Sequence, residues 1–304
     1  IRRPPAQPDT VKSVAFTNFD CKVKRAEIDS MIIGLAEYGA EYTGHLEDAD
    51  ILIVNTCAVT EKAQKNGEKY LSSVKKAHPH CLIVATGCTA ELYKNQPGKL
   101  GADICIPNSD KEQTLEIIFK AKSETAAAPS TSTGTRAFLK IQDGCDAFCT
   151  YCIIPSLRGR PVSRNEAEIL QEFHTLVEKG YKEIVLTGIH IGLYGIDTGT
   201  SLAELLNKLV PIEGDFRIRL TSLYVNEITP ELIDCINKSN DKISQHFHIS
   251  IQSCSADILR AMGRKYTPQD IYSAVSRIRE VLKDAYIGAD IITGFPGETE
   301  TLYQ

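Results

Sequence analysis

Short apolar runs alternate with amphipathic segments along roughly the first 125 residues of the chain. One such segment carries Ile28, Met31, Ile32, Leu35 and Ala36, and this 3, 4, 7, 8 spacing predicts a helix. Regular alternation of strands and helices implies a parallel sheet with helices on both faces. The expected strands are Ser13–Phe16, Ile51–Asn55, Leu82–Thr86 and Ile104–Ile106, and further helices are expected over Glu61–Lys76 and Gln113–Lys122.

The pattern changes at residues 126–135, which are small and polar and predict a linker between domain 1–125 and domain 136–304. Five βα-type units follow, which favour a full or partial barrel that works at the C-terminal ends of its strands. The last strand is not followed by a complete helix, so we expect a truncated barrel. Expected strands are Phe138–Ile141, Glu183–Leu186, Arg217–Leu220, Phe247–Ile251 and Ile287–Ile292, with helices near Glu166–Lys179, Leu202–Val210, Pro230–Lys238 and Pro268–Lys283.

Composition narrows the class of protein. The 304 residues carry a formal charge of −5, which argues against a general nucleic-acid coat but allows a local basic patch. No apolar run approaches the roughly 20 residues of a membrane span, and the first ten residues lack the apolar core of a secretory signal. We therefore expect a cytoplasmic protein with no membrane partner. In a reducing compartment its ten cysteines favour metal ligation or nucleophilic chemistry over disulfides.

Three cysteines stand close together directly after a predicted strand. Cys145, Cys149 and Cys152 form the pattern C-x3-C-x2-C. Zinc usually takes four ligands, and no fourth cysteine or histidine follows at a close spacing. A [4Fe–4S] cluster bound by three cysteines would keep one iron open for another molecule. The pattern therefore predicts a substrate-binding cluster at a strand end of the barrel.

A second set of cysteines lies upstream. Cys21, Cys57 and Cys88 each follow one of the first three long strands, so a parallel sheet would bring them to one edge. The spacing alone is a weak signal, and the strand-end position gives it force. Of the remaining cysteines, Cys254 follows the fourth barrel strand and could face the active site. The others are read as packing residues: Cys81, Cys105 and Cys235.

The motif around Tyr151, which precedes the last cysteine of the C-x3-C-x2-C pattern, resembles the signature of the radical S-adenosylmethionine (SAM) enzymes. Two cysteine triads in this order resemble the methylthiotransferases within that superfamily, over nearly the whole chain. The phrases that carry the resemblance are NTCAVTEKA (55–63), GCTAE (87–91), KIQDGCDAFCTYCIIPSLRGR (140–160), IQS (251–253), MGRKYT (262–267) and DIITGFPGETE (290–300). The chain departs from the family in having Asp20 before the first cysteine and Lys24 where an Asn is usual, and Cys254 replaces a usual glycine.

The resemblance implies two [4Fe–4S] clusters and SAM as cofactors. It assigns one cluster, which binds and cleaves SAM, to Cys145, Cys149 and Cys152, and an auxiliary cluster, which carries sulfur, to Cys21, Cys57 and Cys88. One SAM donates methyl to sulfur, and the other makes the radical that removes a C–H hydrogen. Catalytic residues beyond these ligands stay unknown. Residues expected near SAM are Tyr151, Gly188, Gly294 and Gly297, although plain turns also explain the glycines.

The phrases most resemble the bacterial enzymes that modify C2 of N6-threonylcarbamoyladenosine beside the tRNA anticodon. Sister groups act on N6-isopentenyladenosine in tRNA or on an aspartate of a ribosomal protein. The expected partners are a tRNA anticodon loop and a reductase or flavodoxin-type electron donor. The family's C-terminal RNA-binding β-domain is absent from this sequence, which predicts weak tRNA affinity.

Basic residues follow the second triad. Arg158, Arg160 and Arg164 suit an RNA backbone, or they belong to an ordinary solvated loop. Phe148 and Tyr151 are read either as stacking on adenine or as packing. Three histidines are read as lining the barrel rather than as ligands: His190, His246 and His248.

Two other classes stay open. One is a zinc-binding RNA adaptor without catalysis. The other is a different radical SAM reaction, in which the upstream cluster only relays electrons.

Overall fold

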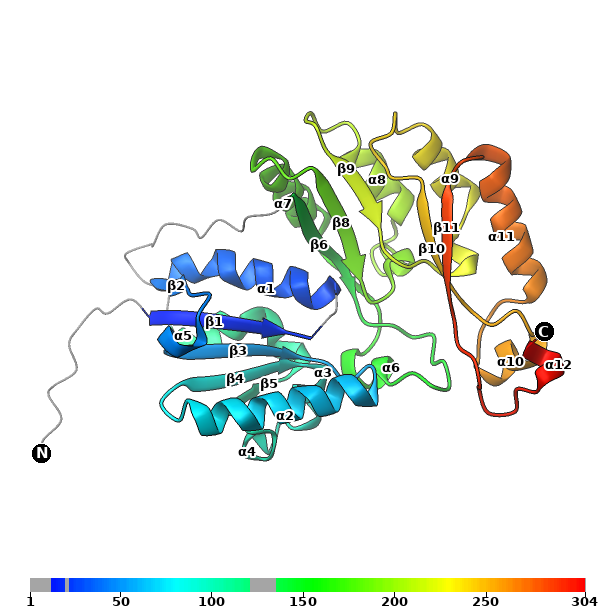
Figure 1. The fold of residues 1–304 in the computed structure, drawn as a ribbon. Helices are drawn as coiled ribbons and strands as arrows, with labels where there is room; N and C mark the ends of the chain where they lie inside the picture. The colour runs from blue at the N-terminus through cyan, green and yellow to red at the C-terminus, as the bar shows by residue number, and fades with distance from the viewer. Residues whose placement is uncertain (1–11, 20–21, 121–134, 304) are drawn as a thin grey trace, which may run out of the picture. The chain divides into compact units, whose positions relative to one another are not determined.

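The computed structural model describes residues 12–19, 22–120 and 135–303 and divides the chain into two compact units, 1–133 and 134–304. The predicted linker 126–135 lies outside the described residues except for Thr135. No helix within these ranges is both long and apolar enough to cross a membrane. Each unit is built from parallel strands joined by helices, as the alternating pattern predicts (Figure 1).

The first unit holds a five-stranded parallel sheet in the order β2-β1-β3-β4-β5. The four predicted strands are confirmed, each within two residues at either end. Strand β2 was missed because its three residues form no apolar run and two of them are exposed. The strands are β1 (Lys12–Asn18), β2 (Ala40–Tyr42), β3 (Ile51–Thr56), β4 (Leu82–Gly87) and β5 (Ile104–Ile106), and the helices are α1 (Lys22–Gly34), α2 (Glu61–Ala77), α3 (Cys88–Leu92), α4 (Pro97–Leu100) and α5 (Thr114–Phe119).

Helices cover both faces of this sheet, and two separate cores result (Figure 1). Alternate residues of β3 supply each core, since side chains of a strand point to opposite faces. Ile51 and Ile53 pack with residues of α1 and α5, whereas Leu52 and Val54 pack with residues of α2 and α4. The β3 strand is buried along its whole length, which agrees with the apolar run 51–54 that forms most of it.

Helix α5 differs from its prediction. It was expected to reach Lys122 but ends at Phe119. The reason is local, because Lys120 takes a left-handed backbone with a φ of 63° and closes the helix there.

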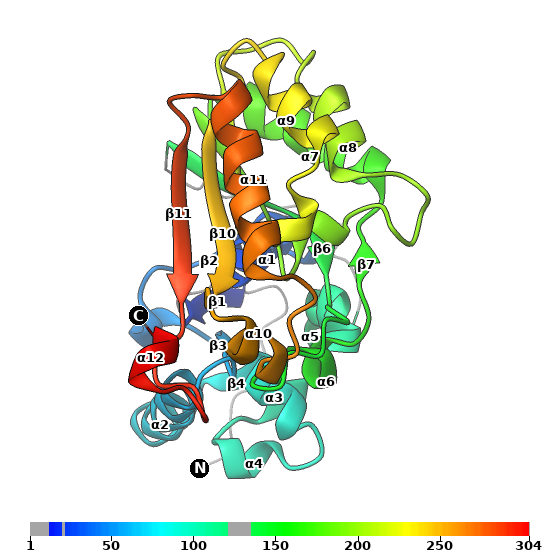
Figure 2. The same cartoon turned by 90° about the vertical axis from the view of Figure 1, so that its right-hand side faces the viewer.

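The second unit contains five parallel strands in chain order, together with the short antiparallel edge strand β7. They form a four-stranded sheet, β7-β6-β8-β9, and a two-stranded sheet, β10-β11. Two isolated parallel β-bridges, Ile218–Ile243 and Leu223–Ile249, connect the two sheets. Figure 2 shows β10 and β11 side by side with α11 beside them. The strands are β6 (Arg136–Asp143), β7 (Val162–Ser163), β8 (Glu183–Gly188), β9 (Arg217–Leu220), β10 (His246–Gln252) and β11 (Tyr286–Ile291).

The helices of this unit begin where polar capping residues stand. Asn165, Ser201, Thr229 and Thr267 each accept a backbone N–H of the following first turn. Proline at the first position of α9 and α11 adds to this start signal. The helices are α6 (Ile154–Arg158), α7 (Glu166–Glu178), α8 (Leu202–Leu209), α9 (Pro230–Asn237), α10 (Ala256–Ala261), α11 (Pro268–Val281) and α12 (Glu300–Tyr303).

Candidate functional site

Four loops of the second unit meet at the C-terminal ends of its parallel strands. Cys145 follows β6, His190 follows β8 and Tyr224 follows β9, while Arg264 follows the short helix α10 in the connection after β10. Residues from these loops line a cavity of about 210 Å³. This is the face on which barrels of this kind build their active sites.

The cysteine loop, residues 144–153, turns sharply away from β6 at Gly144. This glycine has a φ of 72°, and a Cβ atom on it would overlap the carbonyl oxygen of Arg160. Only glycine fits such a position. The Cys145 N–H donates to Gly159 O at 3.0 Å, and the Cys152 N–H donates to Cys149 O at 2.9 Å. Both Cys145 and Cys149 are buried, and Cys152 is half-buried.

A buried ion pair supports the base of this loop. Arg158 Nη1 lies 2.7 and 2.9 Å from the two carboxylate oxygens of Asp143, and Lys140 Nζ lies 2.8 Å from the same carboxylate. Burial disfavours the ionised carboxyl, but the two cations outweigh burial and hold the pKa of Asp143 well below its usual range. The pair therefore ties α6 to the end of β6.

His190 connects a carboxylate to one of the three cysteines. Its Nδ1 lies 3.4 Å from Cys145 Sγ, and its Nε2 forms an ion pair with Glu227. Burial lowers the pKa of His190, but the hydrogen bonds to Cys145 and Glu227 raise it to about 9. The buried amide of Gln142 braces this arrangement, because its Oε1 accepts the His190 N–H at 2.8 Å.

Arg264 reaches a second cysteine. Its Nη1 lies 3.2 Å from Cys149 Sγ. The ring of Tyr224 lies between Arg264 and His190, with its centroid 4.1 Å from the guanidinium carbon and 3.9 Å from the imidazole centroid. Two of the three cysteines thus have a basic side chain against their sulfur atoms.

The donor set of the cysteine loop fits an iron–sulfur cluster. Within the described ranges, no three His, Cys, Asp or Glu side chains converge closely enough to hold one metal ion. A cubane does not require such convergence, because each cysteine binds a different iron. Basic and backbone donors near cysteine sulfurs also suit thiolate ligands. Burial raises the pKa of the Cys152 thiol, so a thiolate there needs a cationic partner such as iron.

Of the four residues predicted near SAM, Tyr151 lies in the cysteine loop, and Gly294 and Gly297 lie in the loop after β11. The Tyr151 ring meets the Phe295 ring edge-on at 6.2 Å, which links the cysteine loop to the loop after β11. Gly294 and Gly297 occupy that second loop with φ values of 71° and 90° and open space around them. The backbone of both residues thus favours glycine, and both lie exposed in this loop.

Gly188, the fourth residue predicted near SAM, ends β8. A Cβ atom there would lie 2.9 Å from Gln142 O, so this glycine permits close packing of β8 on β6. Beside it, Thr187 is fully buried.

The three arginines predicted to bind RNA have different surroundings. The Arg158 side chain is only 1% exposed and pairs with Asp143, so its charge is not presented to a nucleic acid. Arg164 is engaged with Glu172 at 2.5 Å and Glu168 at 3.5 Å. Arg160 is exposed, and it is the arginine of the three that a nucleic acid can reach.

In the first unit, Cys57 and Cys88 lie at the same edge of the sheet. Cys57 follows β3 and Cys88 begins α3 directly after β4, and the residues before them, Thr56 and Gly87, are register partners. The Thr89 hydroxyl donates to Cys57 O at 2.8 Å, and both cysteines are buried. Cys21, the third member of the predicted set, lies outside the described residues.

Buried polar groups are concentrated at this edge of the sheet. Glu27 accepts a hydrogen bond from Asn55 Nδ2 at 2.8 Å and forms an ion pair with Lys111. Asn55 Oδ1 and Lys24 Nζ are among the buried atoms that find no hydrogen-bond partner in the described part of the chain. Since buried polar groups normally are satisfied, these two fit a site that is completed by a polar or charged group. The edge therefore fits a second cluster.

The remaining cysteines and histidines differ in their burial and in their partners. Cys81 and Cys235 are buried, as expected of packing residues, Cys105 is half-buried in β5, and Cys254 is exposed. His246 stacks on Tyr286, and His248 pairs with Asp290 at 2.8 Å.

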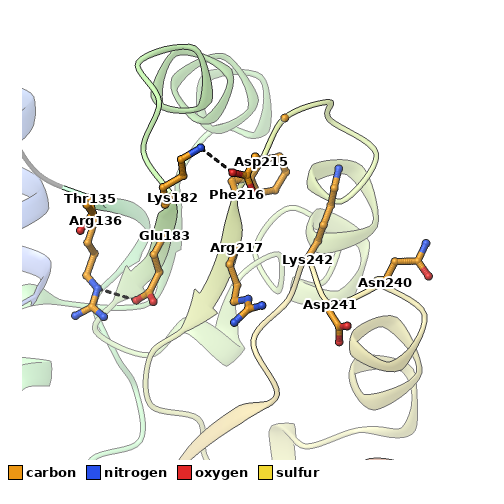
Figure 3. Close-up of a pocket in the computed structure, with 11 residues that line it drawn as sticks. Thr135, Arg136, Lys182, Glu183, Asp215, Phe216, Arg217, Asn240, Asp241 and Lys242 are labelled. Atoms are coloured by element: carbon orange, nitrogen blue, oxygen red, sulfur yellow. Dashed lines mark hydrogen bonds and ion pairs between the residues drawn. The ribbon is translucent and has the colours of Figure 1, made fainter.

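A larger cavity of about 730 Å³ lies at the opposite, N-terminal ends of the strands (Figure 3). Its charged residues largely pair with one another: Arg136 with Glu183 at 2.7 Å, and Lys182 with Asp215 at 2.7 Å. In parallel barrels this end serves stability, so we place the candidate site at the cysteine loop.

Two family models match the chain. The Radical SAM superfamily model matches residues 139–301, and the model of Uncharacterized protein family UPF0004 matches residues 13–106. Among solved structures, the radical SAM methyltransferase TsrM from Kitasatospora setae has a TM-score of 0.68 at 12% identity, covering 96% of this chain and 71% of that one. These matches define the class, a radical SAM enzyme.

Curated relatives give the family. Threonylcarbamoyladenosine tRNA methylthiotransferase MtaB of Thermotoga maritima is 36% identical over 97% of this chain and 70% of its own length. Ribosomal protein uS12 methylthiotransferase RimO of Clostridium botulinum is 35% identical over 94% and 69%, and tRNA-2-methylthio-N(6)-dimethylallyladenosine synthase of Thermoanaerobacter pseudethanolicus is 33% identical over 93% and 65%. The chain belongs to the methylthiotransferase family. Its cofactors are therefore SAM and [4Fe–4S] clusters, of which two are typical in this family.

Sequence reasoning missed the residues that surround the cysteines. His190 was read as lining the barrel, and Tyr224, Glu227 and Arg264 were not singled out. They come from separate loops, and each stands alone in the sequence. The one available signal was that Arg264 lies in MGRKYT, a phrase typical of the family.

Proposed function

We propose that this enzyme adds a methylthio group to C2 of N6-threonylcarbamoyladenosine beside the anticodon of tRNA. The observation that carries the proposal is the 36% identity, across 97% of this chain, to the Thermotoga maritima protein named as a threonylcarbamoyladenosine tRNA methylthiotransferase. Relatives named for isopentenyl-type adenosine or for ribosomal protein uS12 are 33% and 35% identical. These two substrates are the alternatives that the experiment below distinguishes.

Cys145, Cys149 and Cys152 would hold the cluster that binds SAM. When bound, this cluster supplies the electron that cleaves SAM. Residues of the chain shape the cysteine loop for this cluster: Gly144 lets the loop turn, and Arg158 fixes the base of the loop through Asp143. His190 and Arg264 place hydrogen-bond donors at two of the three sulfurs.

Cys57 and Cys88, together with Cys21, would hold the auxiliary cluster, which supplies the sulfur. The described part of this edge places the first two on neighbouring strand ends, where Thr89 fixes the Cys57 carbonyl. Because a cluster bound by three thiolates is anionic, the buried ammonium of Lys24 suits its surroundings.

Arg160 is the residue that we propose for contact with the tRNA backbone, since its side chain is exposed beside the cysteine loop. A phosphate contact positions the RNA without reading its sequence. We also propose a reductase or flavodoxin-type protein as the electron donor.

The substrate is tested by mass spectrometry of nucleosides from tRNA of a deletion strain. We expect the methylthio form of N6-threonylcarbamoyladenosine to disappear and to return on complementation. If the methylthio form of N6-isopentenyladenosine disappears instead, that nucleoside is the substrate. If the methylthio group on ribosomal protein uS12 disappears instead, that protein is the substrate.

The roles of the cysteines are tested with single variants. Cys149→Ala should abolish SAM cleavage, whereas Cys57→Ala should retain SAM cleavage and lose methylthio transfer. A Cys57→Ala enzyme that still produced methylthio-adenosine would disprove the division of roles. Anaerobic reconstitution should give about eight iron atoms per chain, and a colourless zinc protein would favour an RNA adaptor.

A further inference from the structure

The guanidinium group of Arg264 is buried against Cys149. We propose that Arg264 is a positioning residue that hydrogen-bonds the cluster-bound thiolate of Cys149 and raises the reduction potential of that cluster. This inference rests on the proposed assignment of Cys145, Cys149 and Cys152 to the SAM cluster. It adds a specific role for a residue outside the ligand set.

Three hydrogen bonds hold the guanidinium in place. Arg264 Nη1 lies 3.2 Å from Cys149 Sγ, Nη2 donates to Ser250 O at 2.5 Å, and Nε donates to the Tyr266 hydroxyl at 2.7 Å. That hydroxyl in turn donates to Ser250 O and Ile251 O at 2.7 and 2.8 Å. The arginine is thereby anchored to the end of β10, with one nitrogen directed at the sulfur.

Aromatic rings fix the orientation of the same group. The guanidinium carbon lies 4.1 Å from the centroid of Tyr224 and 5.1 Å from that of Tyr266. Such stacking holds the plane of an arginine and favours its charge. The Tyr224 hydroxyl also lies 3.8 Å from Cys149 Sγ, so sulfur, ring and guanidinium form one packed group.

The charge of Arg264 lacks a carboxylate partner within the described ranges. Its hydrogen-bond partners are a sulfur, a carbonyl oxygen and a hydroxyl, and the residue is 9% exposed. A buried cation is costly unless an opposite charge compensates it. A thiolate of an anionic cluster would provide that charge, which explains why a permanently charged residue is tolerated here.

The effect on the cluster follows from its charge. On reduction the cluster accepts one electron, its negative charge increases by one, and no bond forms or breaks. A fixed cation and an N–H donor at a ligand sulfur therefore stabilise the reduced form more than the oxidised form. Loss of Arg264 should make the cluster harder to reduce.

The test is a redox titration with dithionite, monitored by electron paramagnetic resonance, on reconstituted full-length protein without SAM. Every sample carries Cys57→Ala, so that the titration reports the cluster of the cysteine loop. Arg264→Met should keep about four iron atoms per chain. At the midpoint potential of the Cys57→Ala parent, the ratio of reduced to oxidised cluster in Arg264→Met should be about tenfold lower, which equals a shift of about 59 mV to more negative potential.

Two further variants complete the design. Arg264→Lys keeps the charge but cannot reach all three acceptors at once, so its potential should fall by less. Arg260→Met removes an exposed arginine of α10 that pairs with Asp257, and it should leave the potential unchanged. If Arg264→Met fails to fold, an unchanged potential in Arg264→Lys still overturns the inference.

The outcomes separate this inference from the function on which it rests. Absence of iron in the parent protein would reject the cluster assignment itself. A normal iron content with an unchanged potential in Arg264→Met would reject the role of Arg264 alone. An unchanged potential combined with weakened binding of SAM would make Arg264 a SAM-binding residue and overturn the inference.

Discussion

Arg158 and Asp143 form a buried ion pair in which one guanidinium nitrogen lies 2.7 and 2.9 Å from the two carboxylate oxygens. The Arg158 side chain is 1% exposed. The pair joins the end of β6 to the end of α6, which are the two boundaries of the segment that carries the three cysteines. Its removal should therefore affect the stability of the second unit.

Arg158→Met should lower the free energy of unfolding by about 2 kcal/mol, because it leaves the half-buried Asp143 carboxylate with Lys140 as its remaining cationic partner. Urea unfolding of the metal-free protein, followed by circular dichroism, measures this loss. The control is Arg160→Met, whose exposed side chain should be worth no more than about 0.5 kcal/mol. Equal losses in the two variants would contradict the structural role of Arg158.

Gly144→Ala should destabilise the protein more than the same substitution at an ordinary turn glycine. Gly180→Ala is the matched control, since Gly180 has a φ of 82° with open space around it, and it should cost only the left-handed backbone, about 1 to 2 kcal/mol. At Gly144 the overlap with Arg160 O adds about 1 to 3 kcal/mol. Thermal unfolding compares the two, and iron retention should fall in Gly144→Ala alone.

Gly87→Ala should disturb the other cysteine pair. Gly87 has a φ of 89°, and a Cβ there would press on Thr56 and Asn55, directly before Cys57. We expect the iron content after reconstitution to fall from about eight to about four atoms per chain. Gly67→Ala, within α2, meets only Phe19 at 3.9 Å and should retain full iron content with slightly higher stability.

The pKa of Glu183 predicts how the free energy of unfolding depends on pH. It lies between Arg136 and Arg219, at 2.7 and 2.9 Å (Figure 3 shows the pair with Arg136). Burial opposes ionisation, but the hydrogen bonds and charges of the two arginines lower the pKa of Glu183. Because the folded pKa is depressed, its contribution to stability is complete above the ordinary value of 4.5 and is lost as the pH falls through the folded pKa.

Glu183→Gln should therefore destabilise the protein by about 1 kcal/mol at pH 7, and the difference from wild type should shrink steadily below pH 4.5. Urea unfolding of both proteins between pH 7 and pH 3 measures it. A difference that stayed constant with pH would show that Glu183 does not act through its charge.

The strands and long helices could be predicted because each buries a regular pattern. β3 and β4 each begin with a continuous apolar run, since both faces of the sheet are covered. α2 and α11 carry capping residues and a periodic apolar face. The short strands β2 and β7 escaped prediction because their largely exposed residues form no apolar run, whereas the equally short β5 is the apolar triplet Ile104–Ile106. Lys120 ended α5 through a backbone conformation that composition does not reveal.

The cysteine ligands could be proposed from spacing and strand ends, but their surroundings could not. Arg158 has the charge expected of an RNA contact, and only the fold shows that Asp143 buries it. His190 and Arg264 are separated by more than 70 residues, and the parallel strands bring them to one Tyr224 ring. Charge and aromatic character are visible in a sequence, whereas partners supplied by distant loops are not.

The two cores of the first unit have a consequence for the position of Cys57. Ile51 and Ile53 serve one core, while Leu52 and Val54 serve the other. A slip of β3 by one residue would exchange these sets and mismatch both layers of helices at once. The packing of these four side chains thus fixes the residue at which β3 ends. It thereby also fixes the position of the Cys57 thiol, which lies just beyond the strand.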